Sequence, residues 1–396
     1  MQILEFRHRQ PESFGDTARN MAGACLHLAT RLGQVNPYFP LVRLVPLAAQ
    51  EAAEAGEDPG KVVVVQSTPG SRVEKLNSSG CAYHVLLRGL RSGERMDEAR
   101  RVESISRALV AGESWGEVLE LARSPELRIV VSNTTEKGYE VDESDRPDSS
   151  PPNSFPAKLL QVLLARFEAG LPGLTILPCE LIEHNASRLR GLVLGLGELW
   201  GAEPVFLRWA ARECSWHENL VDRIVTGTPE EHSLLDEDPL LVACEPFALF
   251  AIEKVDGELD LFSHPAVLPV DNVTPYALRK VRILNGAHTA LVAKALPAEF
   301  ETVREAVEDP EIGSWLHELL FQEIVPTVSS RVEDAEGFAR EVLERFRNPF
   351  VEHRLEDIAL HHEEKLLTRL LPTREEYAEQ TGEDPVILTE ILRSQG

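Results

Sequence analysis

The chain has 396 residues, of which 43% are hydrophobic and 27% are charged. This length favours two domains over a single core, and the composition is typical of a globular protein with a sizeable interior. Because 65 acidic residues outnumber 40 basic ones, the formal net charge is −25, which repels phosphate backbones and anionic lipids. Nucleic acids and membranes are therefore not expected as partners.

The cysteines and the N-terminal residues indicate in which cellular compartment the protein lies. The five cysteines are odd in number and form no CxxC pair, which favours a reducing environment over a disulfide frame or a structural zinc site. The first residues are charged where a signal peptide needs an apolar core, and no apolar run approaches the roughly 20 residues of a membrane span. We expect a soluble, cytoplasmic protein.

The first part of the chain alternates between strand and helix patterns. A polar turn at 132–138 and an Asp-, Ser- and Pro-rich loop at 142–156 interrupt this alternation. Such alternation predicts a parallel sheet with crossover helices, which binds ligands at the carboxyl ends of its strands. Strands are expected at 61–66, 82–87, 127–131 and 174–178, and helices at 115–122 and 156–170.

After a last strand at 266–270 the pattern becomes helical. The predicted fold is therefore α/β: a nucleotide-binding-type domain with a parallel sheet over residues 1–271, followed by an all-α domain over 272–396. Helices are expected at 275–295, 299–306, 311–324, 333–346 and 350–370.

The helix expected at 275–295 carries the most informative polar residues. Thr274 suits the N-cap and Pro275 the first helical position. At about 100° per residue, Asn285 lies about 140° and His288 about 80° from Lys280, so all three occupy one side. A partly desolvated lysine can transfer the hydroxyl proton of an alcohol–ketone pair, while an amide donates to the oxyanion and a histidine orients the substrate.

The same spacing also fits a solvent-facing lysine, a packed asparagine and a core histidine with its hydrogen bonds satisfied.

The sequence K-V-R-I-L-N-G-A-H-T, which begins at Lys280, resembles the lysine signature of the mannitol dehydrogenase and aldonate oxidoreductase superfamily. Further motifs resemble its tagaturonate reductase branch, and they follow the family order from about residue 60 to residue 372. These motifs are S-N-T-T-E from Ser132, P-C-E-L-I from Pro178 with Asn185, N-L-V-D-R-I-V-T-G from Asn219, F-R-N-P-F from Phe346 with His353, and the run from Ile358 through Lys365 and Arg369 to Pro372.

The resemblance implies a Rossmann-like dinucleotide-binding domain and a helical substrate domain. It also implies an NAD(H)-dependent oxidoreductase that reduces a keto sugar acid, of the tagaturonate-to-altronate type, or a related ketose–polyol pair. The implied catalytic residues are Lys280 as general acid/base and Asn285 and Asn219 as oxyanion donors; the substrate ligands are His288, His353 and Lys365; the cofactor residues are Gln66, Asn133, Thr134 and Thr135.

Other properties of the site are open at this point. No acidic residue at Gln66 would repel a 2′-phosphate, so NADP stays possible beside NAD. No metal is expected, the partner is a small sugar acid or polyol, and the protein is a monomer or a homodimer.

Two departures from the family pattern limit the resemblance. Relatives carry a GxGxFxRA turn after their first strand, whereas the stretch 3–19 has only Gly15, with Arg7, His8 and Arg9 as an alternative source of positive charge. Before Lys365, relatives have small neutral residues, whereas this chain has the run 361–364, H-H-E-E. We interpret that run as a solvated helix face rather than a metal site, because adjacent helical residues point about 100° apart.

The first departure motivates an alternative function, a non-catalytic homologue that has lost dinucleotide binding. A third possibility keeps Lys280 reactive but uses it for Schiff-base or isomerase chemistry.

Overall fold

The structure, a computed structural model, describes residues 2–6, 26–29, 41–67, 70–134, 136–256, 259 and 261–394. The chain forms two compact units. The first comprises Met1–Leu86, Ala99–Cys244 and Ala248–Asp271, and the second Leu87–Glu98, Glu245–Phe247 and Asn272–Gly396. Within these described ranges, no helix is both long enough and apolar enough to cross a membrane.

The first unit is built on a sheet that is parallel at its centre. Strand β2 pairs in parallel with β3 and β7, β3 with β6, β7 with β8, and β8 with β9, which confirms the predicted parallel sheet. Only β1 runs antiparallel, against β3 and β7. The strands are β1 Gln2–Phe6, β2 Leu26–Ala29, β3 Val62–Gln66, β6 Ile105–Val110, β7 Leu127–Ser132, β8 Thr175–Pro178 and β9 Ser215–Trp216.

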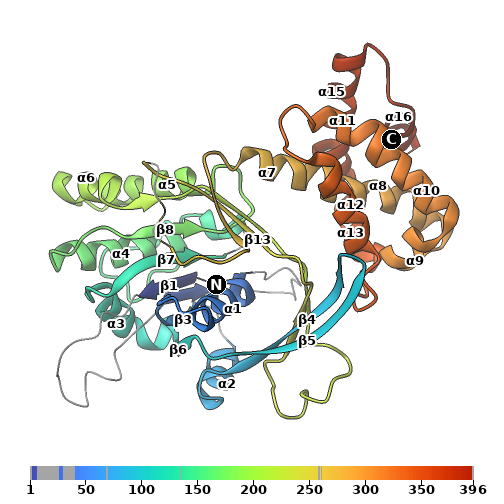
Figure 1. Ribbon diagram of the computed structural model, residues 1–396. Helices are drawn as coiled ribbons and strands as arrows, with labels where there is room; N and C mark the ends of the chain where they lie inside the picture. Colours follow the sequence, from blue (N-terminus) through green and yellow to red (C-terminus); the bar gives the residue numbers. More distant parts are fainter. Residues whose placement is uncertain are drawn as a thin grey trace. The chain divides into compact units, whose positions relative to one another are not determined.

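Helices α3, α4, α5 and α6 lie beside this sheet, and each packs against the next (Figure 1). Helix α4 is buried along most of its length, and its Arg166 guanidinium donates to the carbonyl groups of Pro172 and Ser124. The predicted strands at 61–66, 127–131 and 174–178 and the helices at 115–122 and 156–170 are confirmed within a few residues. The helices of this unit are α1 Leu41–Glu54, α2 Arg72–Ser78, α3 Ala111–Ala122, α4 Phe155–Glu168, α5 Asn185–Leu199 and α6 Pro204–Arg212.

Two smaller sheets were largely missed by the sequence patterns. The strand expected at 82–87 is longer, and with β5 it forms a hairpin whose end, Leu87–Glu98, belongs to the second unit. Nearly every residue of β5 is exposed, so it lacks the apolar alternation that identifies a strand. These sheets contain β4 Tyr83–Arg91, β5 Glu94–Val102, β10 Asn219–Asp222, β11 Val225–Gly227, β12 Val242–Cys244, β13 Leu249–Glu253 and β14 Val267–Val270.

The second unit is helical, as predicted, with three π-helical segments inserted into longer runs. The predicted single helix over 350–370 is wrong: residues 350–354 are not helical, and a left-handed His361 (φ 58°) separates α13 from α14. The elements are α7 Thr274–Arg279, η2 Lys280–Asn285, α8 Gly286–Ala295, η3 Leu296–Ala298, α9 Val303–Glu308, α10 Pro310–Glu318, η4 Leu319–Ile324, α11 Val325–Val328, α12 Ala335–Phe346, α13 Leu355–Ala359, α14 His362–Lys365, η5 Leu366–Leu370, α15 Leu371–Thr381 and α16 Val386–Ser394.

We predict that Gly173→Ala destabilises the parallel sheet of the first unit. A Cβ at Gly173, just before β8, would overlap the Glu213 carbonyl group, which is backbone and cannot rotate away. The free energy of unfolding should fall by about 1–3 kcal/mol, as for an overpacked core. Urea unfolding measures this. Gly191→Ala in α5, whose Cβ meets no atom within 4 Å, is the control and should not destabilise. Equal stability of the two variants would contradict the prediction.

Candidate active site

The buried carboxylate of Glu180 organises the carboxyl edge of the parallel sheet. Its Oε1 accepts from the Thr134 amide (2.6 Å) and the Thr134 hydroxyl (2.9 Å), and its Oε2 accepts from the Ser132 hydroxyl (2.9 Å). The Tyr139 hydroxyl lies 3.3 Å from Oε2 and 2.9 Å from the Asn185 carbonyl oxygen. Burial, and then the Glu180 charge, raise the pKa of the Tyr139 phenol, so Tyr139 stays a donor.

Asn219 lies at the same edge and presents an acceptor rather than a donor. Its Nδ2 donates to the carbonyl oxygens of Pro178 (2.9 Å) and His217 (3.0 Å), which uses both amide hydrogens. Its Oδ1 is buried, and no group in the described residues donates a hydrogen bond to it. Asn185 reinforces this position, because its Nδ2 donates to the Asn219 carbonyl oxygen at 3.0 Å.

The residues expected to hold a dinucleotide lie at the ends of β3 and β7, the two strands on either side of β2. Gln66 ends β3, and Asn133 and Thr134 follow β7; all three are buried. The hydroxyl of Ser67, next to Gln66, is buried and has no hydrogen-bond partner among the described residues, so it is available to bond a ligand. Thr135 and the residues of the atypical first turn, Arg7, His8, Arg9 and Gly15, lie outside the described residues.

In the second unit, Lys280 and Asn285 bound a π-helical segment, both half-buried. A π-helix joins residues five apart by a backbone hydrogen bond, so these two residues lie about one turn apart. The angle of 140° expected for an α-helix therefore does not hold between them. Single-turn π segments are frequent at functional sites because they re-aim side chains within a helix.

His288 is a buried, neutral histidine with one unsatisfied nitrogen. Burial above all, and then the neighbouring His353 and Arg345, hold its pKa well below the ordinary value. Its ring bonds the Leu284 carbonyl group, and within the described parts of the chain the buried Nε2 has no hydrogen-bond partner. Nδ1 is thus the donor, and Nε2 carries a free lone pair. The alternative of a core histidine with all its hydrogen bonds satisfied does not fit.

Two rings enclose His288. The His353 ring centroid lies 4.7 Å away in an edge-on arrangement, and that of Phe346 lies 4.1 Å away. Burial lowers the pKa of His353 to about 4, with Asp357 opposing this shift and Arg345 adding to it. Beside them, Arg345 forms a buried two-bond ion pair with Glu245 (2.9 and 2.8 Å) and lies over the Phe247 ring at 4.2 Å.

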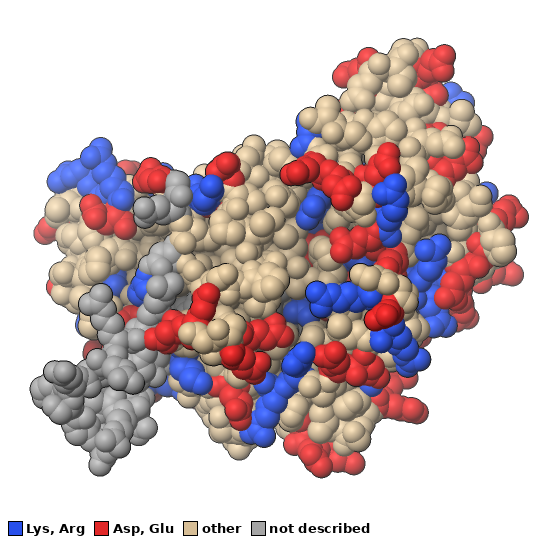
Figure 2. All heavy atoms as spheres, in the orientation of Figure 1, with Lys and Arg blue, Asp and Glu red and all other residues tan. Residues whose placement is uncertain are grey.

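Lys365 and Arg369 form a basic group at the start of η5. The Lys365 ammonium donates to the Ile358 carbonyl oxygen at 2.8 Å, and Arg369 donates to the buried Thr289 hydroxyl at 3.3 Å. Burial, and then Arg369, lower the pKa of Lys365. On the face drawn in Figure 2, acidic side chains are spread among basic ones, so an anionic ligand needs a local basic group of this kind.

The H-H-E-E run is not the continuous helix face that the sequence suggested, because the left-handed His361 precedes α14. His362 is half-buried, and neither of its ring nitrogens has a hydrogen-bond partner. Across the part of the chain that the structure describes, no group of three or more His, Cys, Asp or Glu side chains could hold a metal ion.

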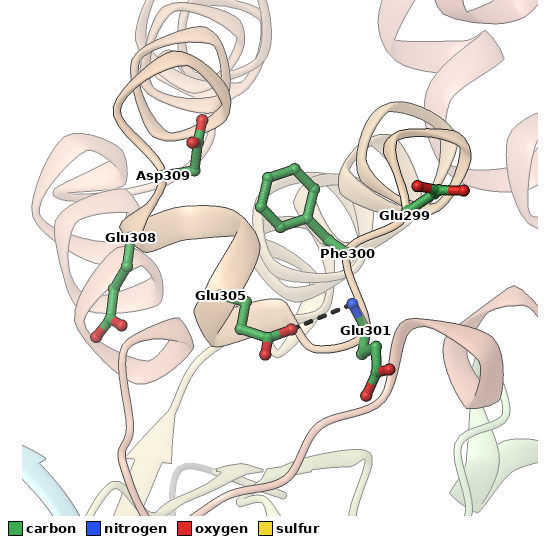
Figure 3. A pocket seen from close by; sticks show the side chains of 6 residues that line it. All are labelled: Glu299, Phe300, Glu301, Glu305, Glu308 and Asp309. Atoms are coloured by element: carbon green, nitrogen blue, oxygen red, sulfur yellow. Dashed lines mark hydrogen bonds between the residues drawn. The ribbon is translucent and has the colours of Figure 1, made fainter.

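An acidic pocket of 590 Å³ in this unit is unsuited to a carboxylated ligand (Figure 3). Two of its acidic side chains bond the backbone: Glu305 accepts from the Glu301 amide and closes a capping box with Thr302, and Asp309 caps α10. The lining residues are Glu299, Phe300, Glu301, Glu305, Glu308 and Asp309.

A parallel sheet with polar groups at its carboxyl edge, followed by a helical unit, defines a Rossmann-type dehydrogenase fold. Comparison with known proteins agrees. Residues 56–262 match the family model of the mannitol dehydrogenase Rossmann domain, and residues 272–392 match that of the mannitol dehydrogenase C-terminal domain. The chain belongs to the mannitol dehydrogenase family.

Individual relatives support this assignment. The chain is 40% identical over 342 residues to an altronate oxidoreductase of Bacillus subtilis (strain 168), an alignment that covers 82% of this chain and 70% of the relative. Its fold resembles that of Pseudomonas fluorescens mannitol 2-dehydrogenase, solved as a ternary complex with NAD and D-mannitol (TM-score 0.72, 23% identity, covering 93% and 77% of the two chains). It also resembles D-sorbitol dehydrogenase (TM-score 0.75, 23% identity, covering 91% and 77%).

The family resemblance indicated Gln66, Asn133, Thr134 and Asn219 at the sheet edge. Neither the resemblance nor the sequence patterns indicated the organising role of Glu180 or the contribution of Tyr139. One feature of the sequence points to Glu180. In the P-C-E-L-I motif this acidic residue lies two positions after the end of a buried strand.

We predict that Glu180→Gln destabilises the protein. An amide nitrogen would face the Thr134 or Ser132 donors and leave at least one of them unsatisfied in a buried place. The free energy of unfolding should fall by about 1–3 kcal/mol in urea titrations. The matched control is Glu183→Gln, three residues along and exposed, which should leave stability unchanged. A Glu180→Gln variant as stable as the control would show that the carboxylate is not needed.

We predict that His353 makes stability depend on pH. Its folded pKa of about 4 lies below the ordinary value of about 6.5, so between these values the unfolded chain binds more protons. The stability is complete above about pH 6.5 and is lost as the pH falls toward 4. At pH 5 the wild type should have lost about 2 kcal/mol more than His353→Asn, relative to pH 7.5, in urea titrations. Parallel pH curves for the two proteins would contradict this.

Proposed function

We propose that this chain is an NAD(H)-dependent oxidoreductase that reduces a keto sugar acid, of the tagaturonate-to-altronate type, with Lys280 as general acid/base. The observation that carries the proposal is His288, a neutral histidine whose unpartnered, buried Nε2 lies eight residues after Lys280. Relatives 40% identical over most of the chain are altronate oxidoreductases, which supports a sugar acid rather than a polyol.

The residues divide the proton and hydrogen-bond chemistry between them. Lys280 gives its proton to the carbonyl oxygen during reduction and takes it back during oxidation. The Asn285 amide donates to the oxygen as negative charge develops there. His288 Nε2 accepts from a substrate hydroxyl, and His353 packs against the same ring and contacts the substrate beside it. Because both histidines are neutral, neither competes with Lys280 as the acid.

Asn219 has a different proposed role from the oxyanion donor that the family resemblance implies. Both of its amide hydrogens are engaged by carbonyl groups, so only Oδ1 is available. We therefore assign it as an acceptor for a hydroxyl or amide group of the bound ligands. Lys365, with Arg369 beside it, binds the carboxylate of the sugar acid.

The sheet edge of the first unit suits a nicotinamide dinucleotide, which supplies the hydride when bound. Gln66 lies where the adenosine ribose would bind, and Asn133, Thr134 and Thr135 follow the strand next to the pyrophosphate path. The unpartnered Ser67 hydroxyl adds hydrogen-bonding capacity at this edge. Dinucleotide binding is thus assigned to residues 1–271 and substrate binding to 272–396. We propose NAD as the cofactor, and binding measurements with NADH and NADPH distinguish it from NADP.

We predict that Lys280→Ala lowers kcat for NADH-dependent reduction of tagaturonate by roughly 10²–10⁴-fold, the usual contribution of a general acid. NADH binding, measured by calorimetry, should be unchanged. The matched control is Lys294→Ala, an exposed lysine on α8 of the same helical run, which should retain full activity.

Two results would contradict the proposal. Failure of the wild type to bind NADH or NADPH at millimolar concentration would favour a non-catalytic homologue, an outcome that the missing GxG turn motivates. Borohydride trapping of Lys280 with a keto sugar acid, without any need for nicotinamide, would indicate Schiff-base chemistry instead.

A further inference from the structure

The last residue of α12 and the stretch that follows this helix carry the two rings that enclose His288. Phe346 ends α12, and His353 follows seven residues later. Between them the chain is not helical, so helix hydrogen bonds do not hold its path. The position of His353 therefore depends on what anchors the residues on either side of it.

The end of the β4–β5 hairpin anchors this stretch on the upstream side (Figure 1). The buried Asn348 donates through Nδ2 to the Arg88 carbonyl oxygen (3.0 Å), and its Oδ1 accepts from the Phe350 amide (3.0 Å). The Gly93 amide donates to Glu344 at 3.0 Å. The guanidinium groups of Arg88 and Arg95 lie 5.2 and 4.4 Å from the centre of the Phe350 ring, and Arg88 is held in turn by Asp97 (2.7 Å).

Gly89 permits this close approach. A Cβ at Gly89 would lie 2.6 Å from Pro246 Cδ and 2.8 Å from Asn348 Nδ2, both closer than real Cβ contacts. Pro246 is the neighbour of Glu245, which pairs with Arg345 in the buried ion pair beside the histidines. The hairpin end, the 245–247 segment and the 344–350 stretch therefore pack together at Gly89 with no free space.

On the downstream side, backbone hydrogen bonds anchor His353. The Val303 amide donates to the His353 carbonyl oxygen, and the Leu355 amide to the Glu301 carbonyl oxygen, both at 2.9 Å. Only two residues separate His353 from the upstream anchor at Phe350. Three residues span at most about 11 Å when extended, so the place of Phe350 limits where His353 can lie.

We propose that the β4–β5 hairpin end is a positioning element of the substrate site, in which Gly89 and Asn348 set the place of His353 against His288. The hairpin touches no reacting atom; it acts through the stretch that it holds. The catalytic consequence rests on the proposed function, whereas the effect on the His353 ring does not.

The test compares wild type with Gly89→Ala, which overpacks the junction, and Asn348→Ala, which removes its hydrogen bonds. Glu344→Ala loses only the bond from Gly93 and keeps the buried junction intact, so it is a milder variant that should fold. Gly116→Ala in α3, whose Cβ meets no atom within 4 Å, is the matched control. Each protein is assayed for KM and kcat with NADH and tagaturonate, for NADH Kd, and for histidine ring titration by NMR, with the His353 signal assigned by its loss in His353→Asn.

In Gly89→Ala and Asn348→Ala we expect KM to rise at least tenfold, with kcat within threefold and NADH Kd within twofold of wild type. The His353 titration should move from about pH 4 toward the ordinary value of about 6.5 as the ring becomes hydrated. Glu344→Ala should show the same changes at about one third of the size.

Unchanged KM and unchanged His353 titration in folded variants would overturn the proposal, as would equal losses of substrate and NADH binding, which indicate general loosening. If Gly89→Ala and Asn348→Ala do not fold, Glu344→Ala decides by the same criteria. If wild type does not turn over tagaturonate, the proposed function fails, and the His353 titration alone decides the role of the hairpin.

Discussion

The Glu180 carboxylate is the interaction on which the first unit's ligand edge depends. Four donors from three segments converge on its two oxygens, so the ends of β7 and β8 and the turn after β7 cannot move independently. A neutral side chain of the same shape lacks enough acceptor sites for these donors. The position of Thr134 follows from this buried charge, because both its amide and its hydroxyl donate to the carboxylate.

In the second unit, backbone geometry rather than a buried charge positions the polar side chains of the site. The segment Lys280–Asn285 widens one helical turn, and η5 repeats this beside Lys365. In both places charged or amide side chains lie at the boundary between α- and π-helical turns. Widened turns weaken local hydrogen bonding, and the apolar packing of the unit, with Ile283, Ala287, Ala290 and Leu291 fully buried, compensates for this.

The sequence predicted the elements whose burial determines their pattern. The consecutive valines of β3 indicate a buried strand, and the apolar spacing of α4 indicates a helix with a buried face. Both elements are confirmed. The charged strand β5 was missed because hydrogen bonds to β4, and not side-chain burial, hold it in place. The helix expected at 350–370 failed for a related reason: long-range contacts of Asn348 and a left-handed His361 override local helical preference there.

Part of the candidate site could likewise be predicted from the sequence, and part could not. Residue types and spacing singled out Lys280, Asn285 and His288, and the family resemblance added the others. Residue spacing could not show that both amide hydrogens of Asn219 donate to carbonyl groups, because one of these groups, that of Pro178, lies 41 residues away in the sequence. Nor could it show that His288 Nε2 has no partner among the described residues, because this depends on how the ring is buried. The donor role of Asn219 is where the inference from resemblance and the geometry disagree most clearly.

The composition of the second unit has an evolutionary consequence. Arg345 is buried, and its two-bond partner Glu245 comes from a stretch that precedes the helical region by almost thirty residues, while the hairpin end comes from still earlier in the chain. A helical region transplanted alone into another protein would carry a buried guanidinium without its carboxylate, a large penalty for folding. Gene fusion or domain shuffling would therefore have to move the hairpin end and residues 245–247 together with the helical region.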